Sequence, residues 1–124
     1  MKRVRIFIFI FLLSTSGAMA TPPAKLILSY DAKERVLNID ITHPSIDMSE
    51  HFIRRIVIYK NGEQFEQVFL NKQPHPYQYV YPVPLDLLPN DKISVKVYCR
   101  EGGAKTAALD GEAAAIPPMT EKDY

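Results

Sequence analysis

Hydrophobic and polar residues alternate with a period of two along two stretches of the chain, residues 35–41 and 92–99. In the first stretch, the apolar positions are Leu37, Ile39 and Ile41. In the second, they are Ile93, Val95, Val97 and Cys99. Because successive side chains of a strand point to opposite faces, each stretch is predicted to be a strand with one buried face.

Further strands are predicted from shorter signals. Residues 25–30 are rich in β-favouring side chains, and residues 52–60 and 63–70 flank the pair Asn61-Gly62. Both residues of that pair tolerate a positive φ, so the pair predicts a type I′ hairpin. A weaker strand is expected around residues 105–109.

The segment 74–84 combines four prolines with three tyrosines. Proline has no N–H group to donate to a β-ladder, so any strand in this segment is predicted to lie at a sheet edge. Residues 85–91 then predict a turn that leads into the strand at 92–99.

The first twenty residues have the pattern of a secretory signal peptide. Lys2, Arg3 and Arg5 precede an apolar run, and Ala18-Met19-Ala20 fits the small-residue cleavage pattern. We therefore expect a mature chain that begins at Thr21 and is periplasmic or secreted. The apolar run is too short to span a bilayer comfortably and no later run is longer, so no membrane anchor is expected.

Six or seven short strands separated by turns predict an all-β fold, an immunoglobulin-like β-sandwich of about seven strands. One domain is expected, over residues 21–110. The remaining segment, 111–124, has little to bury and is predicted to be disordered.

Charge and cysteine content narrow the classes of partner. Without residues 1–20 the chain keeps 12 basic and 14 acidic residues, which argues against a nucleic-acid partner. Its one cysteine, Cys99, cannot form a disulfide within the chain. An exported lone thiol is a free thiol, an intermolecular partner, a metal ligand or a small buried hydrophobe.

Strand parity brings candidate chemistry to one place. His43 continues the inward series that ends at Ile41, and Cys99 ends the inward series of its own strand. If those strand ends are neighbours, an imidazole and a thiolate meet at one rim of the sandwich, and His51 could close the gap. Two histidines and a cysteine suit a borderline metal such as iron, zinc or copper.

Each of these residues also has a plainer interpretation. His43 could be a strand-end histidine bonded to backbone, His51 an exposed loop histidine, and Cys99 core filling. His75 is expected to be a solvated loop residue, with a fourth-ligand role only if its loop folds over the rim. A nucleophilic pair of Cys99 and His43 is also conceivable, but no third residue to orient it is identifiable.

Three motifs together resemble the ferrous-iron domain of desulfoferrodoxin and neelaredoxin, the superoxide reductases. They are His43-Pro44, the segment 50–53 (Glu-His-Phe-Ile) and Tyr98-Cys99. The resemblance spans roughly residues 35–103. It implies a mononuclear non-haem iron held by histidines and an axial cysteine thiolate, with an open position at which superoxide is reduced to peroxide.

The ligand set that this resemblance implies is incomplete. The family continues from its cysteine as Cys-x-x-His, whereas Gly102 stands at that position here. The family's early Glu-Lys-His motif is absent, and seven residues separate His43 from His51 against five in the family. What remains is His43, His51 and Cys99 as metal ligands, with metal binding or redox chemistry in an altered form.

A second resemblance implies a non-enzymatic role. Residues 43–62 and 89–103 are also similar to the Z subunit of the periplasmic thiosulfate-oxidation carrier complex, an immunoglobulin-like interaction subunit. In that interpretation Cys99 ligates nothing and the sheet edges bind a carrier protein. The expected partners are thus a redox partner, a carrier protein or a second copy of the chain.

Overall fold

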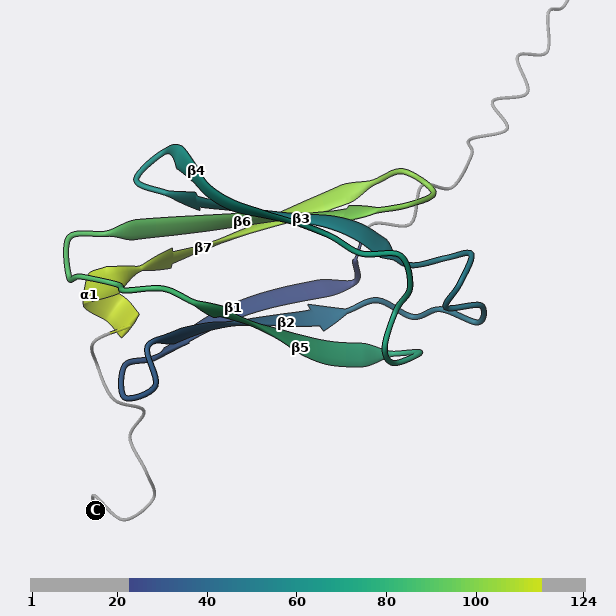
Figure 1. The fold of residues 1–124 in the computed structure, drawn as a ribbon, viewed down its shortest axis with the longest axis horizontal. Helices are drawn as coiled ribbons and strands as arrows, with labels where there is room; N and C mark the ends of the chain where they lie inside the picture. Colours follow the sequence, from purple (N-terminus) through teal and green to yellow (C-terminus); the bar gives the residue numbers. More distant parts are fainter. Residues whose placement is uncertain (1–22, 115–124) are drawn as a thin grey trace, which may run out of the picture.

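Two antiparallel sheets pack face to face in the computed structural model, which describes residues 23–114 (Figure 1). The elements, in chain order, are β1 (Lys25–Asp31), β2 (Val36–Thr42), β3 (Ile53–Lys60), β4 (Glu63–Phe69), β5 (Gln78–Pro84), β6 (Lys92–Cys99), β7 (Ala104–Asp110) and a helical turn, α1 (Gly111–Ala114). One sheet has the order β1-β2-β5 and the other β4-β3-β6-β7. The predicted all-β sandwich of about seven strands is confirmed.

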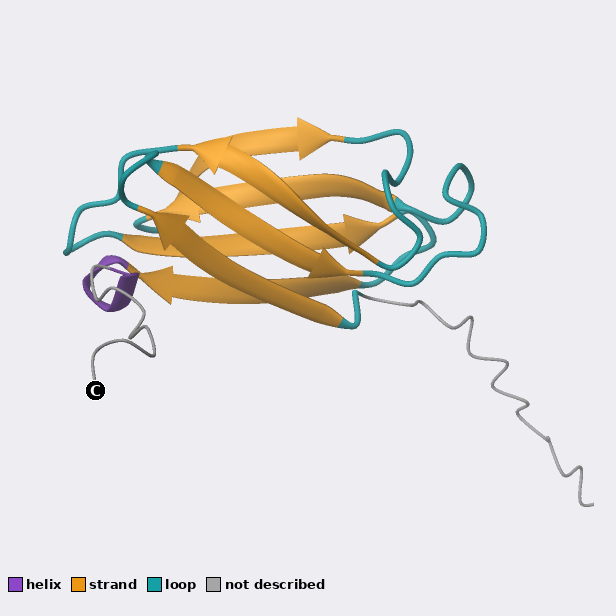
Figure 2. Ribbon diagram, turned by 90° about the horizontal axis from the view of Figure 1, so that it is seen from below, coloured by secondary structure: helices purple, strands orange, loops and turns teal. Residues whose placement is uncertain are grey.

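The core lies between the sheets and is built by the residues with period-two spacing. Ile39 and Ile41 on β2, and Val95 and Val97 on β6, have no exposed surface. Each such side chain contributes roughly 1.5–3 kcal/mol when fully buried. Figure 2 looks onto the faces of the two layers, one in front of the other, with the strands of one sheet running obliquely across those of the other.

Residue type explains one hairpin and one edge strand. Asn61 and Gly62 have φ values of 54° and 83°, as the predicted type I′ hairpin between β3 and β4 requires. The proline-rich segment forms β5, which pairs with β2 alone and lies at the edge of its sheet. The prediction of an edge strand there is confirmed.

The two chain ends are described only in part. The predicted signal peptide, residues 1–20, lies outside the described residues, as do residues 115–124 of the predicted tail. The first four tail residues form α1, in which the Gly111 amide donates to the Asp91 carbonyl at 2.8 Å. Across residues 23–114, no helix has the length and apolar character needed to cross a membrane.

The strand directions bring three connecting loops to one end of the sandwich. Thr42 pairs with Gln78, and Ile53 pairs with Cys99, so β2 and β6 end where β3 and β5 begin. The connecting loops, residues 43–52, 70–77 and 100–103, lie together at the right-hand end in Figure 1. We call this end the rim.

Candidate metal centre

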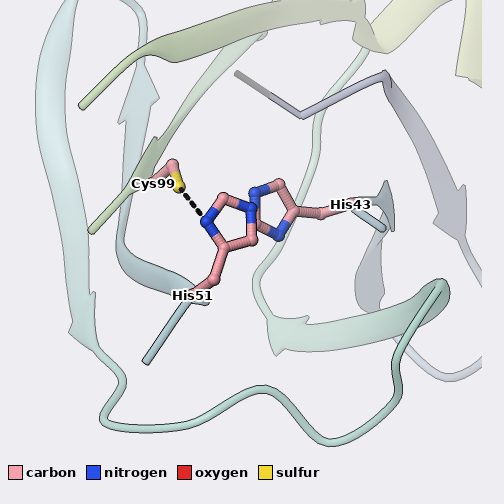
Figure 3. A group of neighbouring side chains, drawn as sticks. All are labelled: His43, His51 and Cys99. Atoms are coloured by element: carbon pink, nitrogen blue, oxygen red, sulfur yellow. Dashed lines mark hydrogen bonds between the residues drawn. The ribbon is translucent and has the colours of Figure 1, made fainter. Parts of the chain in front are cut away.

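His43, His51 and Cys99 meet at the rim (Figure 3). One ligand atom from each, an imidazole nitrogen or the thiol sulfur, lies within 4.8 Å of the others. His43 follows the last residue of β2, Cys99 is the last residue of β6, and His51 precedes β3 by two positions. The convergence predicted from strand parity is therefore present. Ligation itself stays a prediction.

The cluster is closed on the core side and open on one other. His43 and Cys99 are each only 1% exposed, whereas the His51 side chain is 18% exposed. Of the three residues, His51 is therefore the one in contact with solvent.

Gln73 holds the His43 ring. His43 Nδ1 lies 2.7 Å from Gln73 Oε1, and Gln73 Nε2 donates to the His43 carbonyl at 2.6 Å. The backbone amide of His43 donates to the Tyr77 carbonyl at 2.9 Å. Ring and backbone of His43 are thus both fixed by the loop between β4 and β5.

A tight turn fixes the segment that carries His51. The amides of Glu50 and His51 donate to the Asp47 carbonyl, at 3.2 and 2.8 Å. The Asp47 carboxylate accepts from the side chain and amide of Ser49, and these hydrogen bonds lower the pKa of Asp47. The Ser45 hydroxyl donates to the His51 carbonyl, which ties the two arms of the segment together.

The His51 ring lies next to Glu101, Cys99 and His43. Its Nδ1 lies 2.9 Å from Glu101 Oε2 and 3.9 Å from Cys99 Sγ. The ring stacks on His43, with centroids 4.5 Å apart and planes inclined by 18°. Because the rings are nearly parallel, their in-plane nitrogen lone pairs point perpendicular to the stacking axis and not toward the facing ring.

In the hairpin after Cys99, Gly102 stands where the resembled family has a histidine. The backbone conformation of the hairpin suits a glycine at this position. The Cys99 amide donates to the Gly103 carbonyl at 3.0 Å, and the Gly102 amide to the Cys99 carbonyl at 3.1 Å. This tight turn places Gly102 and Gly103 at φ values of 101° and 82°, which side-chain-bearing residues rarely adopt. Gly102 therefore supplies a backbone conformation in place of a ligand.

Burial sets the protonation of the thiol. Desolvation raises the pKa of Cys99, and the negative charge of Glu101 acts in the same direction. The thiol is therefore favoured over the thiolate near neutral pH in the absence of a cation, and Cys99 is poorly suited to act as a free nucleophile.

For the conceivable nucleophilic use of Cys99, the structure gives His51 as the neighbouring imidazole. The thiol contacts His51, and Glu101 is the carboxylate that could have served as its third member. Sulfur and carboxylate, however, both approach Nδ1 of His51. A relay needs the base on one nitrogen and the orienting group on the other.

His75 lies apart from the cluster among the described residues. Its side chain is exposed, and its Nδ1 accepts from the amides of Tyr77 and Gln78, both at 3.3 Å. The loop does fold onto the rim, but it inserts Gln73 in place of His75. Neither Gln73 nor Glu101 was marked by sequence reasoning, because an isolated polar residue in a loop carries no periodic signal.

Comparison with solved structures finds similarity to superoxide reductases. No family model matches the sequence, and no curated protein matches it. The structure is similar to a superoxide reductase (neelaredoxin) from Ignicoccus hospitalis, with a TM-score of 0.43 and 14% identity over 75% of this chain and 82% of that one. It is also similar to a superoxide reductase in the oxidised state, with a TM-score of 0.42 and 15% identity over 73% of this chain and 90% of that one. Superoxide reductases are the family that the sequence motifs resemble.

Proposed function

We propose that this protein binds a single transition-metal ion through His43, His51 and Cys99, as a superoxide-reductase-like domain with a reduced ligand set. The observation that carries the proposal is the convergence of one ligand atom from each residue to within 4.8 Å at the rim. Iron is the metal that the sequence resemblance favours.

The donor set fits such an ion. Two imidazoles and a thiolate are ligands for metals of borderline softness, including iron. Metal–nitrogen and metal–sulfur bonds of the lengths known for zinc would separate donor atoms by roughly 3.5 Å. Donor atoms up to 4.8 Å apart therefore need only a small contraction.

Loading requires the His51 ring to turn. Imidazole donates through a lone pair in the ring plane, and two nearly parallel rings cannot both direct a lone pair at one point between them. His43 is buried and held by Gln73, whereas His51 is partly exposed and bonded to the exposed Glu101. We therefore expect His51 to rotate and His43 to stay.

The chain's own residues define what the centre could do. A bound iron would supply a one-electron couple and an open position, which the resemblance assigns to reduction of superoxide by one electron and two protons to hydrogen peroxide. Cys99 must lose its proton to ligate, so metal binding should release a proton and weaken at low pH. The partly exposed His51 marks the side from which a small anion can enter, and the electron must come from a redox partner.

Export is part of the same proposal and rests on the pattern of residues 1–20. A leader of this kind would place the centre in the periplasm or outside the cell. N-terminal sequencing of the protein recovered from cell fractions tests this, with Thr21 as the expected first residue.

Metal analysis of the purified protein tests the proposed function. We expect close to one metal ion per chain, lost in His43→Ala and retained in His75→Asn. The asparagine oxygen can replace the ring nitrogen of His75 as acceptor for the following amides, which makes this variant a matched control. A metal-free protein that captures a partner chain would contradict the proposal and favour the interaction role of the thiosulfate-oxidation Z subunit.

A further inference from the structure

Gln73 is a buried polar residue in an exposed loop. It is 3% exposed, while its neighbours Lys72, Pro74 and His75 are all exposed. Its backbone amide donates to the Met48 carbonyl at 3.0 Å. The loop between β4 and β5 is thereby anchored against the segment that carries His51.

The orientation of the Gln73 amide follows from its partners. Gln73 Nε2 lies 2.6 Å from the His43 carbonyl and 2.8 Å from the His75 carbonyl. Carbonyl oxygens only accept, so the group facing them must be the NH₂. The amide oxygen is then the atom that lies 2.7 Å from His43 Nδ1.

This orientation decides where the His43 proton sits. An amide oxygen only accepts, so His43 Nδ1 must carry a hydrogen in order to donate to it. In the neutral ring the lone pair is then on Nε2, which is the atom able to bind a metal.

We propose that Gln73 is a positioning residue of the metal centre: it holds His43 as the Nδ1–H tautomer, so that Nε2 is the donor atom presented at the rim. The metal-binding purpose of this arrangement rests on the proposed function, whereas the tautomer itself does not. Outer hydrogen-bond partners of ligating histidines commonly fix ring orientation in this way.

The amide does what similar side chains cannot. Glutamate could accept from His43 Nδ1 but could not donate to the carbonyls of His43 and His75. Leucine fills a similar volume and makes none of the three hydrogen bonds. Comparing the two variants therefore separates the acceptor role toward the ring from the structural role toward the backbone.

The tautomer is tested on the full-length protein without metal. Ring ¹⁵N chemical shifts of His43 should show a protonated Nδ1 in the wild type and in Gln73→Glu, and a loss of that preference in Gln73→Leu. A protonated Nε2 in the wild type, or an unchanged tautomer in a folded Gln73→Leu, would overturn the proposal. If Gln73→Leu does not fold, the wild type and Gln73→Glu still decide it.

Affinity for Co²⁺, used as a spectroscopic probe, tests the link to the metal. We expect Gln73→Leu to bind about 10–100-fold more weakly, the usual cost of losing an outer partner, and Gln73→Glu to lose less. The control is Val83→Ala, a core truncation at the far end of β5 that should lower stability and leave affinity unchanged. Affinity that falls with stability in all three variants would show a merely structural role and overturn the proposal.

The two measurements distinguish two kinds of failure. Absence of Co²⁺ binding in every protein, with the Nδ1–H tautomer present, would refute the proposed function and leave Gln73's control of the ring intact. Tight binding that ignores Gln73 would refute the positioning role and leave the proposed function intact.

Discussion

The two ends of the sandwich bury polar groups of different kinds. At the rim, His43 and Cys99 lie beneath His51. At the opposite end, where Figure 1 shows α1, the residue Asp91 is 8% exposed. Its Oδ1 accepts from Asn61 Nδ2 and its Oδ2 from the Leu88 amide, each at 2.8 Å.

The two ends differ in the groups that face their buried side chains. Around Asp91 each carboxylate oxygen meets an N–H donor, and Lys60 Nζ adds a cation 3.5 Å away. That arrangement is a turn-stabilising network. At the rim, the two imidazoles stack and the thiol contacts one of them, and all three groups are of a kind that can bind a metal ion. Similar burial therefore serves structure at one end and offers donor atoms at the other.

The largest expected effect is on metal binding at the rim. Cys99→Ser should lower affinity by more than the roughly 10–100-fold cost of losing an outer partner, because a hydroxyl is a poor substitute for a thiolate. The thiolate-to-metal charge-transfer absorption of the Co²⁺ form should vanish in Cys99→Ser and persist in Asp91→Ala. Persistence of the band in Cys99→Ser would remove Cys99 from the site.

The next largest effect is on stability at the opposite end. Asp91→Ala removes the acceptor for Asn61 Nδ2 and for the Leu88 amide, so thermal unfolding should shift down by several degrees. Co²⁺ affinity of the folded variant should equal that of the wild type. Weaker metal binding would mean that the two ends are coupled through the core.

Lowering the pH should affect the two ends of the sandwich at different pH values. Hydrogen bonds from Asn61 and Leu88, with the charge of Lys60, lower the pKa of Asp91 below its ordinary 3.8. A carboxyl group whose pKa is lower in the folded state stabilises the fold at pH values above its unfolded-state pKa. That stabilisation is lost as the pH falls through its folded-state pKa. Asp91 should therefore protect the fold down to about pH 3.8 and lose its contribution below it.

Metal release should come earlier in the same titration. Imidazole and thiolate ligands must be deprotonated to bind, so Co²⁺ should dissociate at a higher pH than the pH at which the fold is lost. Absorption of the Co²⁺ form and denaturant unfolding, followed over the same pH series, check both parts. Simultaneous loss of metal and fold would contradict the separation of the two ends.

The smallest effect is expected at Glu101. Its carboxylate accepts from His51 Nδ1 at 2.9 Å but is half exposed, so water can replace it. Glu101→Gln keeps an acceptor and should change Co²⁺ affinity less than Gln73→Leu does. A larger loss than that of Gln73→Leu would indicate that Glu101 itself ligates the metal.

Sequence periodicity carried the prediction of the fold and part of the site. Alternation along residues 35–41 and 92–99 placed His43 and Cys99 on the inner faces, and both are buried. Asn61-Gly62 marked the hairpin because few residue pairs accept two positive φ values. These features depend on residues close together in the chain, so they can be predicted from a single sequence.

Gln73 and Glu101, which contact the two histidines, could not be identified from the sequence in this way. Gln73 reaches His43 across 30 positions in the sequence, and Glu101, in the turn after β6, reaches His51, which precedes β3. Such contacts depend on how a loop of unpatterned sequence closes over the sheet. His75 stood out in the sequence because it is a histidine, yet its ring stabilises its own loop.

The turn after Cys99 has a consequence for redesign. A fourth protein ligand would most simply be sought at Gly102, but its φ of 101° makes any side chain there a source of backbone strain, of order 1–3 kcal/mol. Gly102→His would therefore have to remodel the hairpin that also orients Cys99. An engineer who wishes to enlarge the coordination sphere should begin at Glu101, where the backbone already accepts a side chain that reaches His51.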